Sequence, residues 1–110
     1  MLYRLEKLNK LFLQELSAII NREIEFDELV IATVMRVEID KELTQAKIWI
    51  SVLPHEKTKK VIGQIVRRKG EIRKLLNRKI QLRHLPDFIF LADESEEKAQ
   101  QIENLINTII

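Results

Sequence analysis

The sequence is short of several residue types, and each shortage excludes a class of structure or chemistry. It contains no cysteine, which excludes disulfides, thiol nucleophiles and zinc sites built on cysteine. No apolar run approaches the length of about 18 residues that a membrane-spanning helix needs. Charged residues interrupt the N-terminal stretch every three or four positions. We therefore predict neither a transmembrane helix nor a signal peptide. Repeats, low-complexity tracts and linkers are also absent.

What the sequence does contain is enough apolar material for a folded core. Hydrophobic residues make up 45% of the 110 residues and charged residues 33%, which is typical of a globular protein rather than a disordered one. A chain of this length suits one compact domain. We predict a single domain over residues 1–110 and a cytoplasmic location, with which the lack of cysteine is compatible.

Positive charge is concentrated in one segment. Lys57 to Arg83 holds eleven of the 19 lysines and arginines and only one acidic residue, Glu71, so its formal charge is +10. The rest of the chain sums to −8. A local positive field of this size is typical of proteins that bind polyanionic nucleic acid.

The basic segment has the hydrophobic spacing of two helices joined by a kink. Apolar residues recur at helical spacing on both sides of Gly70: Val61, Ile62, Ile65 and Val66 before it, and Ile72, Leu75 and Leu76 after it. We predict helices over His55–Arg68 and Glu71–Arg78. Glycine adopts a positive φ at low cost, so Gly70 is expected to provide the bend.

The remaining elements follow from their periodicity. An apolar stripe predicts a first helix over Leu2–Glu23. Alternating patterns predict an antiparallel hairpin of strands over 32–40 and 46–52 and a third strand over Asp87–Ala92. One face of the first strand would be formed by Thr33, Met35, Val37 and Ile39. A last helix, capped by Asp93 or Ser95, would bury Ile102, Leu105, Ile106 and Ile109. The predicted order is α-β-β-α-α-β-α.

Five stretches in the same register resemble one known family. They are Ile19–Ile24, Val37–Ser51, Gly70–Leu76, Leu82–Arg83 with Leu85–Phe90, and Asp93. They are similar to ribosome-binding factor A, a bacterial factor that assists late maturation of the small ribosomal subunit. The β-α-α-β order around a kink is likewise the core of a K-homology (KH) domain of the second type.

The resemblance implies an α+β, KH-like type II fold, with a three-stranded sheet and a helix–kink–helix at Gly70. In this family an Ala-x-Gly kink replaces the usual Gly-x-x-Gly loop. Here the triplet is Arg68-Lys69-Gly70, so the glycine matches and Arg68 replaces the alanine. The resemblance also implies binding to small-subunit rRNA near the decoding region and the 5′-end helix. Importance for growth in the cold is implied as well.

The predicted RNA-binding residues come from the basic segment and from the first helix. They are Arg67, Arg68, Lys69, Gly70, Arg73, Lys74, Arg78, Lys79, Arg83, Arg4 and Lys7. A helix turns by about 100° per residue, so these residues cannot all face one ligand. Arg67, Lys74 and Arg78 could share a surface across the kink, and Arg68 and Lys69 are expected to point outward. For each cation the alternative is an ordinary solvated surface.

Other candidate sites have simpler explanations. His55 and His84 lack the nearby ligand or carboxylate that a metal or acid–base site needs, so we expect surface histidines. Trp49 either stacks a base or covers a helix. Residues 63–70 lack the Gly-Lys-Ser/Thr ending of a phosphate loop. We therefore expect no catalytic residue, no metal and no cofactor, and predict that the protein is not an enzyme.

Two functions fit these patterns. The preferred one is a monomeric assembly factor that binds small-subunit rRNA and the free small ribosomal subunit and supports late rRNA processing. The alternative is a peripheral module that binds anionic membranes or acidic proteins through the same helices. The basic helices carry no Trp or Phe on an exposed apolar edge, which counts against membrane binding.

Overall fold

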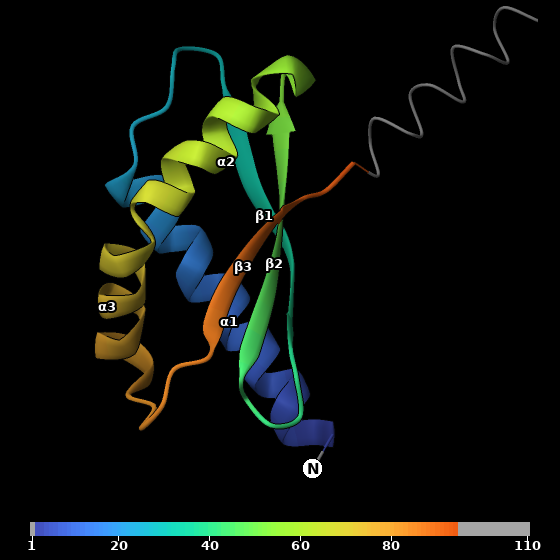
Figure 1. The fold of residues 1–110 in the computed structure, drawn as a ribbon, viewed down its shortest axis with the longest axis vertical. Coiled ribbons are helices and arrows are strands. Elements are labelled where there is room, and N and C mark those ends of the chain that lie inside the picture. Colours follow the sequence, from blue (N-terminus) through green and yellow to red (C-terminus); the bar gives the residue numbers. More distant parts are fainter. Residues whose placement is uncertain (1, 95–110) are drawn as a thin grey trace, which may run out of the picture.

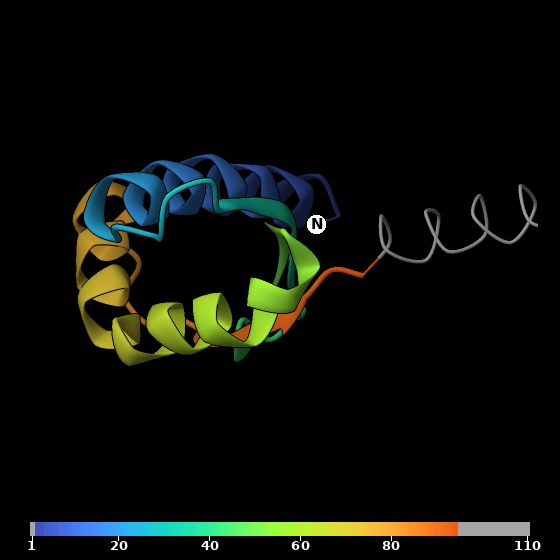
Figure 2. The ribbon, with the colours of Figure 1, turned by 90° about the horizontal axis from the view of Figure 1, so that it is seen from above.

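A computed structural model describes residues 2–94, with side chains from Arg4 onward, and places the helices on one side of a three-stranded sheet (Figures 1 and 2). The elements are α1 (Leu2–Glu23), β1 (Ile31–Ile39), β2 (Gln45–Leu53), the short 3-10 helix η1 (His55–Lys57), α2 (Thr58–Arg67), α3 (Lys69–Ile80) and β3 (Asp87–Ala92). The predicted α+β class is confirmed, and so is the predicted order α-β-β-α-α-β over the described residues. The predicted last helix, with its stripe from Ile102 to Ile109, lies outside the described residues.

The sheet is mixed, in the order β1-β2-β3. β1 and β2 form an antiparallel hairpin, whereas β2 and β3 run parallel. A parallel pair needs a crossover connection, and α2 and α3 provide it. This β2-α2-α3-β3 unit is the KH-like type II core that the sequence predicts. The basic segment is therefore the crossover of the sheet.

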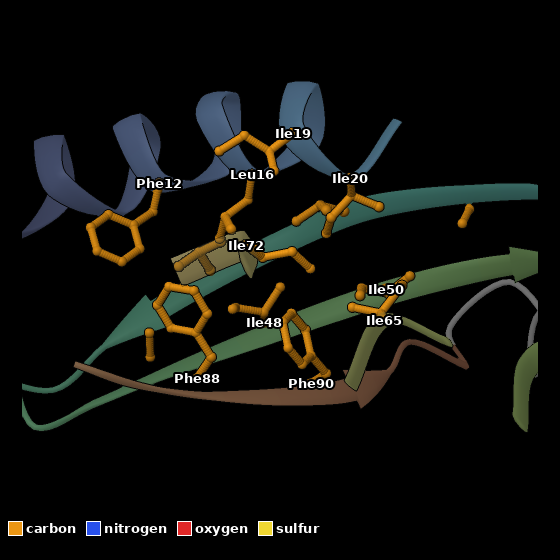
Figure 3. Close-up of a cluster of buried hydrophobic side chains, with 14 of the residues drawn as sticks. Phe12, Leu16, Ile19, Ile20, Ile48, Ile50, Ile65, Ile72, Phe88 and Phe90 are labelled. Atoms are coloured by element: carbon orange, nitrogen blue, oxygen red, sulfur yellow. The ribbon is translucent and has the colours of Figure 1, made fainter. Parts of the chain in front are cut away.

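One side of the sheet, α1 and the crossover helices enclose the core (Figure 3). The apolar stripe of α1 is buried along its length, including Phe12, Leu16 and Ile20. Phe88 of β3 meets Phe12 edge-on, with ring centroids 6.2 Å apart, and Phe90 in the same way at 6.1 Å. Each strand and helix thus contributes side chains to one continuous cluster, which fixes the position of the crossover.

The predicted face of β1 is wrong in its first half. Thr33 and Met35 are exposed, and the buried residues of the strand are Ala32, Val34, Val37 and Ile39. A β-bulge between Val34 and Arg36 causes the difference. A bulge adds one residue to a strand, so the side-chain alternation reverses beyond it. A regular period of two therefore cannot describe the whole strand.

The kink is formed by Arg68 rather than by Gly70. α2 ends at Arg67 and α3 begins at Lys69, and Arg68 between them has φ −98° and ψ 9°. Gly70 lies in the first turn of α3, and neither glycine has a positive φ. The prediction that Gly70 supplies the bend through a positive φ is therefore wrong. The backbone angles of Arg68 lie in a sparsely populated but allowed region that does not require glycine.

Candidate nucleic-acid interface

The side chain of Arg68 holds the kink against α1 and α3. Its Nε and Nη2 atoms donate to Glu71 Oε2 at 2.9 and 2.6 Å, and its Nη1 donates to the backbone carbonyl of Glu23 at 3.0 Å. Glu23 is the last residue of α1, so this guanidinium caps the negative end of the helix dipole. Arg68 was expected to point outward, but its donors point back into the protein. The position that holds a small residue in the family thus carries a structural cation here.

Arg73 makes contacts of the same kind at the start of β3. Its guanidinium donates to the carbonyl oxygens of Pro86 and Leu85, the latter at 3.3 Å, and its Cζ atom lies 5.0 Å from the ring centroid of Phe88. These bonds satisfy carbonyls of the loop that leads into the strand. Two of the predicted RNA-binding arginines therefore stabilise the fold directly.

Six other predicted RNA-binding cations of the basic segment make no side-chain hydrogen bond or ion pair with any residue between 4 and 94. They are Arg67, Lys69, Lys74, Arg78, Lys79 and Arg83. All are exposed except Lys69, which is half-buried. Their charges therefore remain available to an external anion.

We use the name basic stripe for four exposed residues at the end of α2 and along α3: Arg67, Gly70, Lys74 and Arg78. Gly70, Lys74 and Arg78 follow one another at intervals of four, so they lie on the same face of α3. Arg67 is the last residue of α2, immediately before the kink. Lys74 and Arg78 thus lie on one face of α3, as expected; that Arg67 shares a surface with them across the kink stays a prediction. Lys79 and Arg83 are exposed near the C-terminal end of α3.

The N-terminus of α3 opens beside the basic stripe. The first N–H groups of a helix have no partner within the helix, and no side chain caps those of α3. A Cβ atom added to Gly70 would meet nothing within 4 Å, so the backbone is open to solvent at this turn. Free N–H groups and the positive end of a helix dipole favour a bound anion. The kink therefore combines side-chain charge with backbone donors.

Arg4 and Lys7 lie at the end of α1 that is remote from the kink. Both lie in the first two turns of α1, whereas Arg68 contacts Glu23 at the last residue of that helix. At 1.5 Å per residue, the two ends are about 25 Å apart. The N-terminal half of α1 instead lies near the end of β1, where the Asn9 Oδ1 atom accepts the Ile39 N–H at 3.0 Å. Arg4 and Lys7 are therefore remote from the kink itself, and their contact with RNA stays a prediction.

Lys59 is exposed on α2 and was omitted from the predicted site. It precedes Arg67 by eight residues, which places both on one face of α2 two turns apart. The spacing between Lys59 and Arg67 is visible in the sequence and would have identified Lys59 as a candidate for the same surface. The adjacent Lys60 donates to Asp27 Oδ2 at 2.7 Å, and this hydrogen bond, with the charge of Lys60, lowers the pKa of Asp27. Lys60 thus ties α2 to the loop before β1.

Trp49 lies on the sheet face that points away from the helices. The guanidinium carbon of Arg36 is 3.9 Å from its ring centroid, so a cation rather than a helix covers it within residues 2–94.

His55 is half-buried instead of exposed, and its Nε2 atom is buried without a hydrogen-bond partner among residues 2–94. The same part of the chain shows no group of three or more histidine, aspartate or glutamate residues that could hold a metal ion. None of its helices is long and apolar enough to cross a membrane.

A mixed three-stranded sheet with a basic helix–kink–helix crossover defines a KH-like domain of the second type. The comparisons with known proteins then identify the family. The sequence model of the family described as ribosome-binding factor A matches residues 4–106, so the chain belongs to this family.

Individual relatives agree with this assignment along nearly the whole chain. The ribosome-binding factor A of Thermomicrobium roseum is 32% identical over 108 residues, which cover 97% of this chain and 84% of that protein. The protein of the same name from Brevibacillus brevis is 29% identical, covering 96% of this chain and 88% of the relative. The crystal structure of ribosome-binding factor A from Thermus thermophilus superposes with a TM-score of 0.69 at 20% identity, over 80% of this chain and 94% of the other. A homology model of the Thermus thermophilus factor, fitted into a cryo-EM map of its complex with the 30S subunit, superposes with a TM-score of 0.67 at 20% identity, over 80% of this chain and 93% of the other.

Proposed function

We propose that this protein binds the small ribosomal subunit through its rRNA and assists the maturation of that subunit. The observation that carries the proposal is that six predicted RNA-binding cations of the basic segment have no side-chain partner within residues 4–94. Family membership supports the choice of the ribosome as the polyanion. A relative from Thermus thermophilus has been placed in a complex with the 30S subunit, which supports the choice of the small subunit.

In this proposal the residues of the basic stripe have distinct roles. Arg67, Lys74 and Arg78 contact phosphates, and each contact releases condensed counterions from the RNA. Gly70 lets a phosphate approach the N–H groups at the start of α3, because it has no side chain that would intervene. Arg68 and Arg73 act indirectly by fixing the kink and the loop before β3. Lys69, Lys79 and Arg83 add charge around the stripe.

Binding would favour one arrangement of the RNA over others. A ligand shifts a conformational equilibrium only as far as it binds one state more tightly than the other. The stripe carries no aromatic side chain for base stacking, so we infer that the protein recognises the position of phosphates rather than a base sequence. A factor of this kind would leave once the mature arrangement moves those phosphates. The same proposal has three further parts. The protein supports late rRNA processing, it is important for growth in the cold, and it acts in the cytoplasm.

A pelleting assay with free small subunits, intact ribosomes and anionic vesicles in parallel tests the proposal. We expect the protein to sediment with free small subunits and to be depleted from the pellets of intact ribosomes and of anionic vesicles. If four of the six unpaired cations contact phosphates, the logarithm of the binding constant should fall with the logarithm of salt concentration at a slope of about −3. A slope near zero, or binding to vesicles alone, would contradict the proposal.

The vesicle arm also tests binding to membranes as the alternative function. Val66, 47% exposed, is the one large apolar residue of α2 and α3 with substantial exposure in the described chain. Interfacial helices bury a wide apolar face in the membrane, usually with aromatic residues. The exposed surfaces of α2 and α3 are instead cationic, which favours RNA.

A further inference from the structure

Leu29, in the loop between α1 and β1, is a leucine that neither packing nor backbone geometry explains. Its side chain is 91% exposed, the largest exposure among the large apolar residues of the described chain. Its φ is 68°, and the Val30 N–H donates to the Asp27 carbonyl at 3.1 Å, so Leu29 is the third residue of a tight turn. Glycine and asparagine adopt a positive φ in turns at lower cost than leucine. A bulky residue in a strained backbone conformation, directed into solvent, points to a contact with another molecule.

Two more exposed apolar side chains lie at the same end of the sheet. Ile31 follows Leu29 by two residues, and it pairs with Leu53 where β1 begins and β2 ends. These two side chains are 59% and 39% exposed. Figure 1 shows the start of β1 and the end of β2 at one end of the sheet and the β1–β2 turn at the other. We call Leu29, Ile31 and Leu53 the apolar knob. Exposed apolar patches bordered by polar residues are typical of protein–protein contacts.

The chain around the apolar knob is acidic. Residues 23–35 contain four acidic residues and no lysine or arginine. Asp27 is paired with Lys60 of α2 at 2.7 Å. Glu25 and Glu28 are exposed and make no side-chain hydrogen bond or ion pair with any residue between 4 and 94. Their negative charges repel RNA phosphates and attract a cationic surface.

We propose that the apolar knob docks on a cationic protein of the small subunit while the basic stripe contacts rRNA. The proposal rests on the proposed function, which supplies the particle. A phosphate backbone offers no apolar surface to Leu29 and repels Glu25 and Glu28. Proteins that bind rRNA carry an excess of lysine and arginine for the same reason as this chain does, so their charge matches the acidic loop. Three apolar side chains bury little area, but the contact strengthens binding because the basic stripe already places the chain on the same particle.

Leu29→Asn is the test variant, because it removes the apolar side chain and introduces a residue that accepts a positive φ. The matched control is Leu43→Asn. Leu43 lies in the β1–β2 turn at the other end of the hairpin, has φ 59° and is 37% exposed. We expect Leu29→Asn to weaken binding to free small subunits about fivefold or more, and the control to change it less than about twofold. Unchanged affinity of Leu29→Asn, or an equal loss in the control, would overturn the proposal.

Binding to protein-free small-subunit rRNA separates this proposal from the proposed function. Leu29→Asn should bind protein-free rRNA as tightly as the unmodified chain does, whereas Lys74→Glu with Arg78→Glu should bind both rRNA and subunits about tenfold more weakly. Loss of affinity for protein-free rRNA in Leu29→Asn would show that the knob contacts RNA or supports the fold, and would overturn the proposal. Unchanged binding of the Lys74/Arg78 variant would instead contradict the proposed function and leave the result for Leu29→Asn as it stands.

Cross-linking identifies what the apolar knob contacts. A diazirine amino acid that replaces Leu29 should cross-link to a protein of the free small subunit, and mass spectrometry should place the cross-link beside lysine or arginine residues of that protein. Cross-links only to rRNA, only to a second copy of this chain, or to neither would overturn the proposal.

Discussion

Gly70→Ala should make the protein more stable and, at the same time, a weaker RNA binder. Gly70 lies in the first turn of α3 without a positive φ, and an added Cβ atom meets nothing within 4 Å. Alanine is favoured over glycine in a helix because it restricts the unfolded chain, so we expect a gain of about 0.5–1 kcal/mol. For a chain of this size the gain raises the melting temperature by roughly 2–6 °C.

The affinity should change in the opposite direction. The methyl group occupies the space through which a phosphate would reach the N–H groups at the start of α3. Loss of one such charge-assisted hydrogen bond weakens binding about threefold to tenfold. Urea midpoints and subunit binding measured on the same preparation give both numbers, and increased stability excludes unfolding as the cause of weaker binding.

Gly63→Ala serves as the stability reference for this prediction. Gly63 lies in the middle of α2, and its added Cβ atom also meets nothing within 4 Å. It should therefore stabilise the protein by a similar amount. Destabilisation by Gly70→Ala together with stabilisation by Gly63→Ala would show that the backbone at residue 70 is not helical. Unchanged affinity in a stabilised Gly70→Ala variant would refute the role of the α3 N-terminus in binding.

Three further predictions concern stability. Arg73→Ala should lower the free energy of unfolding by about 2 kcal/mol in a urea titration, since it leaves the Leu85 and Pro86 carbonyls without their donor and uncovers Phe88. Arg68→Ala should lower the free energy of unfolding by about 1 kcal/mol. The loss is smaller than for Arg73→Ala because the ion pair of Arg68 with Glu71 is partly exposed. A change within experimental error would show that the bond to Glu23 does not hold the kink. Asp40 accepts the N–H of Gln45 and bonds from Thr44, which lower the pKa of its carboxyl group. The stability that Asp40 adds over Asp40→Asn should therefore be fully present at pH 7. It should begin to fall near the unfolded-state pKa of about 3.9 and be lost as the pH drops through the lower folded-state pKa of Asp40.

Periodicity alone predicted the elements whose residues follow one regular pattern. The boundaries of α1 at Leu2 and Glu23, and those of β3 at Asp87 and Ala92, agree with the structure to the residue. In both elements apolar side chains recur at a constant interval and pack on one surface. β1 departs from its prediction because the bulge at Met35 interrupts the interval.

The candidate site was predicted less completely, because many contacts in it join distant parts of the chain. Arg68 and Arg73 look like any other cations of the basic segment, yet they donate to backbone carbonyls of Glu23, Leu85 and Pro86. No local pattern marks a carbonyl as an acceptor for a side chain 45 residues away. The spacing of Lys74 and Arg78, in contrast, depends only on helix geometry and was predictable. Sequence therefore located the basic segment but could not distinguish the cations that bond to other parts of the fold from those that have no partner in the described residues.

The central claim is that the basic stripe, rather than net charge, binds the small subunit. Lys74→Glu with Arg78→Glu reverses two exposed cations of the stripe. Lys10→Glu with Lys41→Glu makes the same change at exposed positions of α1 and the hairpin turn, outside α2 and α3. The decisive measurement is the dissociation constant of both variants for free small subunits at one ionic strength. We expect the stripe variant to bind about tenfold or more weakly and the control to lose less than about threefold. Equal losses in the two variants would contradict a defined site on α2 and α3.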